Sequence, residues 1–393
     1  MINVAIMGFG TVGSGVAEVI RMNNASIAAK LGDDIQVKYI LDIRDFSNSP
    51  YADKVIKDFA IIENDPEVDV VVESIGGAKI ALEFTRRALQ AGKHVVTSNK
   101  ELVATFGKEL LSIAKMRNVN YLFEASVGGG IPVLRPLIQC LAGNQIEEIV
   151  GILNGTTNYI LTRMVKGGIS FADALKEAQA KGYAEADPTA DVEGIDAGRK
   201  ICILSNLAWG KEVAPANISM EGISKIDLAD VDIAAKAGYR IKLLGRAVKF
   251  ADGKQIAYVA PHLVSEDCPI ATVDDVFNGI MIRGNAVGDT MFYGRGAGDL
   301  PTASAVVGDI IDIMQHREHR RDISWNESAE LTKSCEIPMK WYLRGNFSNA
   351  DAEAACGKIE ALAEGAVIVA DLDEAAAKAA AEKLGAVSLL HVL

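Results

Sequence analysis

The sequence predicts an α/β protein whose N-terminal part folds as a doubly wound, Rossmann-type parallel sheet. Over the first 124 residues, short strand-like segments rich in Val and Ile alternate with helix-like segments. The strand segments are almost continuously apolar, as in Val68–Glu73, and such runs are typical of parallel strands buried on both faces. A glycine-rich turn follows the first strand segment, which is where doubly wound folds hold dinucleotides.

The spacing of apolar residues in this first region predicts where each strand and helix begins and ends. The expected strands are Ile2–Met7, Ile35–Leu41, Val68–Glu73, His94–Thr97 and Tyr121–Glu124, and helical patterns span Ala78–Ala91 and Glu101–Arg117. The alternation stops at Gly128-Gly129-Gly130. We therefore place a nucleotide-binding domain at residues 1–128. We expect about residues 296–320, which include the helix-like stretch Ala303–Met314, to complete it.

Two further domains are expected. Residues 129–295 indicate a separate α+β domain, with a strand at Ile146–Leu153, another at Ile256–Leu263, and a capping box at Ser170–Asp173. Residues 338–393 read strand, helix, strand, helix, strand. There Asp351 and Asp373 are expected as helix N-caps, and Gly365 and Gly385 as helix stops.

Composition excludes several function classes. The net charge of −12 disfavours a nucleic-acid partner. The chain has neither 18 consecutive apolar residues nor an export signal, so a membrane-spanning helix is not expected and a cytoplasmic location is. Five scattered cysteines without a CxxC pair indicate reduced thiols rather than disulfides or a zinc site; they are Cys140, Cys202, Cys268, Cys335 and Cys356.

The segment Gly8-Phe9-Gly10-Thr11-Val12-Gly13 matches the GxGxxG pattern. The pattern alone is weak, but here a strand precedes it and an amphipathic helix follows it. Its glycines then allow a tight turn, close approach of a pyrophosphate and close packing of helix on strand. The free N–H groups at the start of the helix suit an anion. A ligand-free glycine turn is the less favoured alternative.

The end of the second strand bears on the choice between NAD and NADP. A carboxylate there accepts hydrogen bonds from a ribose 2′-hydroxyl, whereas an arginine favours a 2′-phosphate. Asp42 and Arg44 are both present. Asp42 follows the strand directly and gives a slight preference for NAD, but the sequence leaves the choice open.

Two segments could carry catalysis. Lys100 follows Ser98 at the end of an expected strand, although a lysine in a loop is usually only solvated. The stretch from Gly182 to Lys200 is rich in carboxylates and runs into a helix on which Asp196 and Lys200 are four residues apart. A surface ion pair explains that spacing equally well. Between these segments, Asn154–Asn158 follows a strand, and a plain turn competes there with recognition of a carboxylate.

These motifs together resemble those of the homoserine dehydrogenase family. The similarity covers roughly the first 315 residues and includes GFGTVG, TSNKELVA, FEASVGGGIP, NGTTNYIL, GYAEADPTADVEGIDAGRK and GRGAGDLPTASAVVGD in order. The resemblance implies reversible hydride transfer between NAD or NADP and a small molecule. That reaction interconverts homoserine and aspartate semialdehyde in the biosynthesis of threonine, methionine and isoleucine.

The resemblance also implies residue roles. Lys200 corresponds to the family's proton donor and Lys100 to a second active-site lysine. Four residues would line the substrate site: Glu185, Asp191, Asp196 and Thr156. Cofactor contacts are implied for Gly8, Phe9, Gly10, Thr11, Val12, Gly13, Asp42, Arg44, Ser98, Lys100 and Gly298. A monovalent cation (Na⁺ or K⁺) would lie among Glu124, Val127, Gly129 and Ile131, mostly on backbone carbonyls. The resemblance also implies that residues 129–295 are the substrate-binding, catalytic and dimerisation domain of a homodimer or a higher homo-oligomer.

The C-terminal segment resembles an ACT domain, a βαββαβ module that can bind a regulatory amino acid. Residues 338–393 read as a shortened version, one strand short. Where an Asp-x-Pro-Gly turn is expected, the chain has Ser348-Asn349-Ala350-Asp351-Ala352. We therefore expect a module used for packing or assembly, and inhibition by threonine is left open.

Two rival functions are weighed. An aspartate-semialdehyde dehydrogenase needs an activated cysteine, and neither Cys140 nor Cys202 lies in a convincing active-site turn. A nucleotide-sensing regulator would be expected to lack the lysines or the acidic cluster, and this chain has both.

Overall fold

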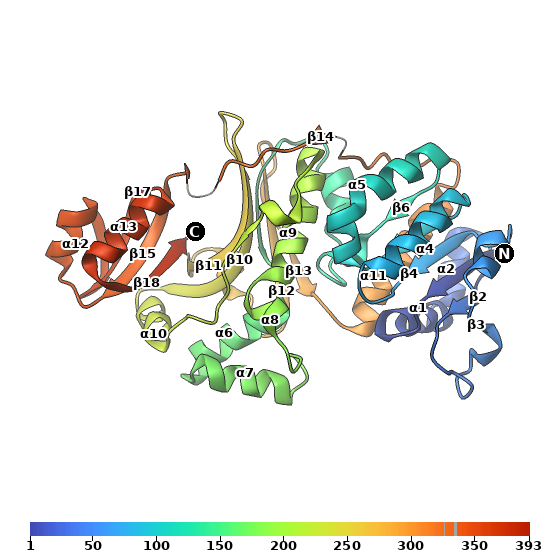
Figure 1. Cartoon of the computed structure of the whole chain (residues 1–393), viewed down its shortest axis with the longest axis horizontal. Helices are drawn as coiled ribbons and strands as arrows, with labels where there is room; N and C mark the ends of the chain where they lie inside the picture. Colours follow the sequence, from blue (N-terminus) through green and yellow to red (C-terminus); the bar gives the residue numbers. More distant parts are fainter. Residues whose placement is uncertain (326, 334–335) are drawn as a thin grey trace. The chain divides into compact units, whose positions relative to one another are not determined.

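The computed structural model describes residues 1–325, 327–333 and 336–393, and these form two compact units (Figure 1). Unit 1 comprises residues 1–143, 206–214 and 294–328, and unit 2 comprises residues 144–205, 215–293 and 329–393. The sequence predicts three domains, but the C-terminal residues belong to the same unit as the middle of the chain. Cys335 lies outside the described residues.

The elements of unit 1 are β1 (Ile2–Met7), α1 (Thr11–Met22), α2 (Asn24–Leu31), β2 (Ile35–Leu41), β3 (Val55–Ile56), α3 (Ala60–Asn64), β4 (Val70–Glu73), α4 (Lys79–Gln90), β5 (His94–Thr97), α5 (Lys100–Arg117), β6 (Tyr121–Leu122), β8 (Lys211–Glu212), α11 (Asp299–Gln315) and β14 (Glu327–Ser328). Those of unit 2 are β7 (Ile146–Ile152), α6 (Gly155–Gly167), α7 (Phe171–Ala180), α8 (Thr189–Val192), α9 (Ile195–Trp209, whose last turn counts with unit 1), β9 (Ser219–Met220), α10 (Leu228–Lys236), β10 (Tyr239–Lys249), β11 (Gln255–Ser265), β12 (Phe277–Gly284), β13 (Gly288–Arg295, whose last two residues count with unit 1), β15 (Met339–Gly345), α12 (Asn349–Cys356), β16 (Ile359–Ala363), β17 (Ala366–Leu372), α13 (Glu374–Leu384) and β18 (Ala386–Val392).

Unit 1 is built on a six-stranded parallel sheet in the order β3-β2-β1-β4-β5-β6. Every residue of β1 and β4 is buried. This burial on both faces explains the continuous apolar runs, and the predicted doubly wound sheet is confirmed. Three expected strands, at 2–7, 35–41 and 94–97, have the predicted bounds.

Glycines let two helices of unit 1 pack closely. A Cβ on Gly15 of α1 would lie 3.0 Å from the Asp299 carbonyl oxygen and 3.1 Å from the Ala303 Cβ of α11. Helix α11 follows α1 by almost 300 residues, yet the two helices pack together (Figure 1). The returning segment therefore lies in unit 1 with the nucleotide-binding sheet.

Unit 2 contains a ten-stranded sheet in the order β13-β12-β7-β10-β11-β18-β15-β17-β16, with β9 also paired to β11. Its centre is the long antiparallel pair β10 and β11, which stays in register from Tyr239 opposite Ser265 to Lys249 opposite Gln255. Strand β7 pairs with β10 and β12, so the segment that follows β7 starts from the interior of the sheet.

The C-terminal module has a complete βαββαβ order, so the expectation of a missing strand is wrong. The apolar run after α12 is a hairpin of β16 and β17, joined by the two residues Glu364 and Gly365. Gly365 has a φ of +70°, so it allows this tight turn and does not end a helix. Helix α12 starts from an N-cap at Ser348, with Asp351 at its third position, and has its C-cap at Gly357. Asp373 and Gly385 cap α13 as expected.

The module shares a hydrophobic core with the central strands of unit 2. Tyr258 of β11 and Val248 of β10 pack in one cluster with Trp341, Leu343 and Val367 of the module. Its last strand, β18, also pairs in parallel with β11. A shared core and a shared sheet explain why residues 338–393 do not form a third unit.

No helix among the described residues is long and apolar enough to cross a membrane. The four cysteines in the described part of the chain are free thiols: Cys140, Cys202, Cys268 and Cys356.

Candidate active site

The glycine turn after β1 has the geometry of an anion cradle. Gly8 has a φ of +88°, and a Cβ there would lie 2.8 Å from the Ser74 carbonyl oxygen. A Cβ on Gly13 would lie 2.0 Å from the Gly8 carbonyl oxygen. At Gly10, in contrast, the nearest atom is an Arg44 nitrogen at 3.8 Å. Two glycines are therefore required by packing, whereas Gly10 leaves the start of α1 open to a phosphate group.

Helix α1 begins directly at this turn. Thr11 is its first residue, and Gly10, its N-cap, provides no side-chain hydrogen bond to the first amides. Thr11 is exposed and Val12 is half-buried. The first N–H groups of α1 are therefore suited to the pyrophosphate of a dinucleotide.

Asp42 and Arg44 pair with each other at the end of β2. The Asp42 carboxylate accepts hydrogen bonds from the Phe9 backbone N–H at 2.7 Å and from Arg44 Nη2 at 2.7 Å and Nε at 3.0 Å. The Arg44 guanidinium and the backbone N–H donors hold the pKa of Asp42 well below its usual range, despite the burial of the carboxyl. The Arg44 side chain remains 57% exposed. Asp42 thus holds the glycine-rich turn through the Phe9 N–H and orients the exposed Arg44 guanidinium.

The loop after β5 carries Ser98 and Lys100. Asn99 between them caps α5, because its side chain accepts a hydrogen bond from the Leu102 N–H. Lys100 is therefore the first residue of the helix, and both Ser98 and Lys100 are half-buried. These positions lie at the carboxyl end of the sheet, the edge where open α/β sheets bind ligands.

A buried carboxyl that the sequence did not reveal lies under this loop. Glu73, at the end of β4, accepts hydrogen bonds from the Thr97 hydroxyl at 2.6 Å and from the Ile75 N–H at 2.7 Å. Burial raises the pKa of Glu73 to about 7. Glu73 connects the ends of two neighbouring strands.

Gly298 lies at the start of α11. It is the N-cap of that helix with a φ of +119°, a conformation reached by glycine and few other residues. The adjacent loop packs on the glycine-rich stretch after β6, because a Cβ on Gly129 would lie 2.5 Å from the Gly296 carbonyl.

In unit 2, Lys200 is buried and paired. Its side chain is 9% exposed, and its Nζ donates hydrogen bonds to Asp196 Oδ2 at 2.7 Å and to the Leu153 carbonyl oxygen at 2.6 Å. A surface pair at this spacing would be solvated, so the surface alternative is wrong. Lys200 and Asp196 thus form an ion pair that is largely removed from solvent.

Asp191 joins this pair through Asn154. The Asn154 amide donates hydrogen bonds to Asp191 Oδ1 at 2.6 Å and to Asp196 Oδ2 at 2.9 Å. Burial raises the pKa of Asp191, and the nearby Asp196 carboxylate raises it further, whereas the hydrogen bond from Asn154 lowers it. The sequence had identified the Asn154 motif without assigning this residue to the site. The Asn-Gly pair directly after a strand was the available signal.

Thr156 and Glu185 lie at the same end of unit 2 with different exposure. The single hydroxyl proton of Thr156 is donated either to the Tyr183 carbonyl oxygen, at 2.6 Å, or to the Asp191 carboxyl. Glu185 is exposed, and its backbone carbonyl accepts a hydrogen bond from Gln179. Thr156 is thus in contact with the carboxylate cluster, whereas the Glu185 side chain points to solvent.

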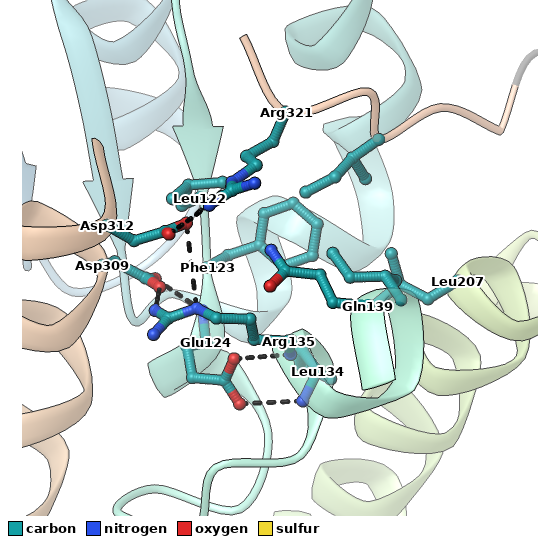
Figure 2. A pocket seen from close by; sticks show the side chains of 12 residues that line it. Leu122, Phe123, Glu124, Leu134, Arg135, Gln139, Leu207, Asp309, Asp312 and Arg321 are labelled. Atoms are coloured by element: carbon teal, nitrogen blue, oxygen red, sulfur yellow. Dashed lines mark hydrogen bonds and ion pairs between the residues drawn. The ribbon is translucent and has the colours of Figure 1, made fainter. Parts of the chain in front are cut away.

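The stretch expected to hold a cation is buried in unit 1. Val127 and Ile131 are 0% and 2% exposed, respectively. The Glu124 carboxylate accepts three backbone hydrogen bonds, from Val133, Leu134 and Arg135 at 2.6 to 2.8 Å, and Figure 2 draws those from Leu134 and Arg135. Among the described residues, no group of three or more His, Cys, Asp or Glu side chains could hold a metal. Backbone carbonyls are therefore the donors available at this stretch, and such hard oxygen ligands fit an alkali cation better than zinc.

A charged cluster surrounds Glu124 (Figure 2). Arg135 pairs with Asp309 at 2.5 Å, and Arg321 pairs with Asp312 at 2.5 Å. Asp309 also accepts the Glu124 backbone N–H at 2.9 Å. These residues line a small cavity of about 20 Å³. This cluster could not be predicted from the sequence pattern, because its members come from three separate stretches of the chain.

The parallel sheet with its glycine-rich turn and the buried Lys200–Asp196 pair fit a nicotinamide-dependent oxidoreductase. The comparisons with known proteins identify its family. Residues 8–124 match the model described as the NAD binding domain of homoserine dehydrogenase, and residues 132–311 match the model described as homoserine dehydrogenase. The chain is 43% identical over 373 residues to the homoserine dehydrogenase of Neisseria gonorrhoeae, covering 92% of this chain and 85% of that protein. It is 42% identical over 320 residues to the Bacillus subtilis enzyme, covering 80% and 73%.

Comparisons with solved structures identify the same family. The homoserine dehydrogenase of Thiobacillus denitrificans matches with a TM-score of 0.92 at 36% identity, covering 100% of this chain and 98% of that one. A hyperthermophilic archaeal homoserine dehydrogenase mutant in complex with NADPH matches with a TM-score of 0.67 at 30% identity, covering 79% and 97%. The chain therefore belongs to the homoserine dehydrogenase family and is an NAD(P)-dependent oxidoreductase with that activity.

Proposed function

We propose that the cluster of Asp191, Asp196 and Lys200 carries the substrate chemistry of this homoserine dehydrogenase, with Lys200 as the general acid and base. The observation that supports this most is the buried Lys200, whose Nζ lies 2.7 Å from Asp196 Oδ2. A lysine ammonium that is fixed by two acceptors and shielded from solvent is suited to proton transfer with a substrate oxygen.

The roles follow from the two directions of the reaction. A bound nicotinamide cofactor supplies the hydride in reduction and accepts it in oxidation. In reduction, Lys200 gives a proton to the aldehyde oxygen, which becomes the hydroxyl of homoserine. In oxidation, Lys200 takes that proton back. Asp191 and Asp196 attract the α-ammonium group, which is common to both substrates, and Thr156 lines the same site. Glu185 contributes to substrate binding, and Lys100 is a second active-site lysine.

We propose that the cofactor turn binds a 2′-phosphate more strongly than a 2′-hydroxyl, and this reverses the slight preference for NAD drawn from the sequence. Each Asp42 carboxylate oxygen already accepts two hydrogen bonds, from Phe9 and Arg44. The ribose 2′-hydroxyl would have to compete with them. Lys57 donates to the carbonyl oxygens of Asp42 and Arg44, and its charge also acts on the neighbouring Asp45. The exposed Arg44 guanidinium is therefore the group at this turn best suited to a phosphate.

The cofactor proposal is tested by titrating the protein with NADP and with NAD, in the wild type and in Arg44→Ala. We expect the wild type to bind NADP more tightly and Arg44→Ala to weaken NADP binding by about 10-fold or more. The affinity for NAD should change little. A wild type that binds NAD more tightly, or a variant that loses both cofactors equally, would contradict this proposal.

The function is tested by following cofactor reduction with homoserine as substrate. As a control, 4-hydroxybutyrate retains the hydroxyl and carboxylate groups but lacks the α-ammonium group. We expect reduction with homoserine and a much lower kcat/KM with 4-hydroxybutyrate, because the carboxylate cluster would lack its cation. Equal use of both alcohols would contradict the role of Asp191 and Asp196. No reduction by folded protein that binds a cofactor would favour the nucleotide-sensor alternative.

We also propose a monovalent cation bound by the backbone carbonyls of Glu124, Val127, Gly129 and Ile131, as the family resemblance implies. Supporting it, this glycine-rich loop is buried and its oxygens are hard donors. A higher melting temperature in NaCl or KCl than in choline chloride at the same ionic strength would support the cation. Equal melting temperatures would count against it.

The C-terminal module and assembly remain proposals as well. Because the module shares a core and a sheet with β10 and β11, we infer that it serves packing or assembly and that threonine does not inhibit the enzyme. Inhibition of homoserine oxidation by threonine in the full chain would overturn this. We further propose a homodimer or a higher homo-oligomer, which light scattering on the purified chain would detect.

A further inference from the structure

The side chain of Asn154 contacts both carboxylates of the candidate substrate site. Its Nδ2 lies 2.6 Å from Asp191 Oδ1 and 2.9 Å from Asp196 Oδ2. Asp191 and Asp196 are 37 and 42 residues away along the chain. One neutral amide therefore bridges two acidic side chains that would otherwise repel each other.

The backbone next to Asn154 holds Lys200, the positively charged side chain of the cluster. The carbonyl oxygen of Leu153 accepts a hydrogen bond from Lys200 Nζ at 2.6 Å, and Lys200 Nζ shares Asp196 Oδ2 with Asn154. The dipeptide at the end of β7 thus fixes all three charged groups, two through the Asn154 side chain and one through the Leu153 backbone.

The fold fixes the orientation of the Asn154 amide. Asn154 is the N-cap of α6, and its Oδ1 accepts the Thr157 N–H at 2.9 Å and the Thr157 hydroxyl at 3.1 Å. With the oxygen held by the helix, the nitrogen must face the carboxylates. The backbone cannot easily shift, because a Cβ on the adjacent Gly155 would lie 2.7 Å from the Val276 carbonyl oxygen.

We propose that Asn154 is a positioning residue for the reaction. Its amide holds Asp191 and Asp196 as a pair without adding charge, so that the negative charge left over by the Lys200–Asp196 ion pair is available to the ammonium group of the substrate. A cation in its place would neutralise the carboxylates, and an apolar residue would leave them to repel each other. The inference deepens the proposed function and rests on the substrate role given there to this cluster.

The charges around Asp191 give this role a measurable consequence. Asp196 and Lys200, both on α9, are the charged groups that act on it, and Thr156 and Asn154 are its neutral partners. The Asn154 hydrogen bond lowers the pKa of Asp191 against the effects of burial and of Asp196. Loss of the amide therefore raises that pKa, and Asp191 takes up a proton at a higher pH.

The experiment compares Asn154→Ser and Asn154→Asp with the wild type. Serine and aspartate both keep an N-cap oxygen for α6, so the helix cap is retained while the amide donors are lost. Asn158→Ser is the matched control. Asn158 lies in the same helix, is 2% exposed, and donates to the Val273 and Phe277 carbonyl oxygens instead of to carboxylates.

For Asn154→Ser we expect the KM for homoserine to rise about 10- to 100-fold. The acidic limb of the pH profile of kcat/KM should move to higher pH. In Asn154→Asp the limb should move further, because a third carboxylate adds its charge. Asn158→Ser should lower the melting temperature and leave the acidic limb in place.

The inference is overturned if both Asn154 variants keep the wild-type KM and acidic limb, since Asn154 would then be only a helix cap. Lys200→Ala separates this failure from that of the proposed function. If Lys200→Ala is inactive while the Asn154 variants behave as wild type, the inference alone is wrong. If Lys200→Ala remains active, the site itself is wrong and both fall.

Discussion

Two groups of charged side chains in this molecule are removed from solvent in different ways. In unit 1, Arg135 pairs with Asp309 and Arg321 pairs with Asp312, while three backbone N–H groups satisfy Glu124 (Figure 2). In unit 2, Lys200 pairs with Asp196, but the hydrogen-bond partners of Asp191 are the neutral Asn154 and Thr156.

The difference fits a structural role for the first cluster and the substrate-binding role proposed for the second. The carboxylates of the unit 1 cluster each have a cation or several backbone donors, so a ligand would gain little by approaching them. Asp191 is half-buried and its hydrogen-bond partners are neutral; burial raises its pKa, as it does that of Asp309 in unit 1, so the neutral partners rather than the pKa distinguish Asp191. A carboxylate kept in that state destabilises the fold slightly and gains a partner when a cation binds. Such a compromise is expected at a binding site.

The largest expected effect is on activity, in Asp191→Asn. Removing the charge that faces the substrate ammonium group should lower kcat/KM for homoserine about 100- to 1000-fold. The free energy of unfolding should stay the same or rise, because the replaced carboxyl is disfavoured in its charged form. Asp187→Asn is the control, since Asp187 is exposed just before α8, the helix that carries Asp191. A loss of stability without a loss of activity would remove the contrast between the two clusters.

The structural cluster should show the opposite behaviour in Arg135→Ala. This change leaves the buried Asp309 without its ion partner, and we expect the free energy of unfolding to fall by about 3 kcal/mol. Urea denaturation measures it. The control is Arg86→Ala, whose pair with Glu109 is largely exposed and should contribute less than about 1 kcal/mol. Similar losses in both variants would mean that the cluster does little for stability.

Glu73 should make stability depend on pH. Its folded-state pKa of about 7 lies above the ordinary value of 4.5, because it is buried. Below pH 4.5 both states are protonated. As the pH rises from 4.5 to about 7, the unfolded state loses its proton while the folded state keeps it, so the folded state is progressively destabilised, and the loss is complete above pH 7. At about 1.4 kcal/mol per pKa unit, the loss should approach about 3 kcal/mol.

Glu73→Gln tests this dependence. The variant keeps an acceptor for Thr97 but cannot ionise, so its free energy of unfolding should fall less between pH 4.5 and pH 8. Asp309, whose pKa is also raised to about 7, contributes equally to both proteins and cancels in the difference. Parallel curves for variant and wild type, from urea denaturation at each pH, would show that Glu73 does not titrate in this range.

The smallest effect concerns the corrected start of α12. Ser348 and Asp351 form a capping box, so Ser348→Ala should cost about 1 kcal/mol. Thermal unfolding measures it. Asn346→Ala, two residues before the cap, is the control. If Ser348→Ala has no effect, the cap is not important for this module.

Much of the fold follows from local patterns. β1, β2 and β5 could be bounded from the sequence because their apolar runs end at polar or glycine residues. The hairpin of β16 and β17 was not predicted because the sequence from Asp351 to Gly365 was interpreted as one helix that Gly365 ends. In the structure α12 ends at Cys356, β16 follows it, and Gly365 belongs to the turn between β16 and β17.

The site was predicted less completely, for a physical reason. The spacing of Asp196 and Lys200 is local, so the pair could be proposed from the sequence. The Asn154 bridge, the Arg135–Asp309 pair and the Glu73–Thr97 bond join residues 42, 174 and 24 positions apart. The sequence pattern does not reveal such contacts, because they form only when the elements pack. The pairing of Asp42 with Arg44 was also missed, although both were identified as candidates.

Lys200 is proposed to transfer the substrate proton, and the Lys200→Ala variant tests this role most directly. The measurement is kcat for homoserine oxidation at saturating cofactor, with circular dichroism and cofactor titration to show that the variant folds and binds. We predict that kcat falls about 1000-fold while the dissociation constant of the cofactor is unchanged. A folded, cofactor-binding variant that retains kcat within a few-fold of the wild type would contradict the claim.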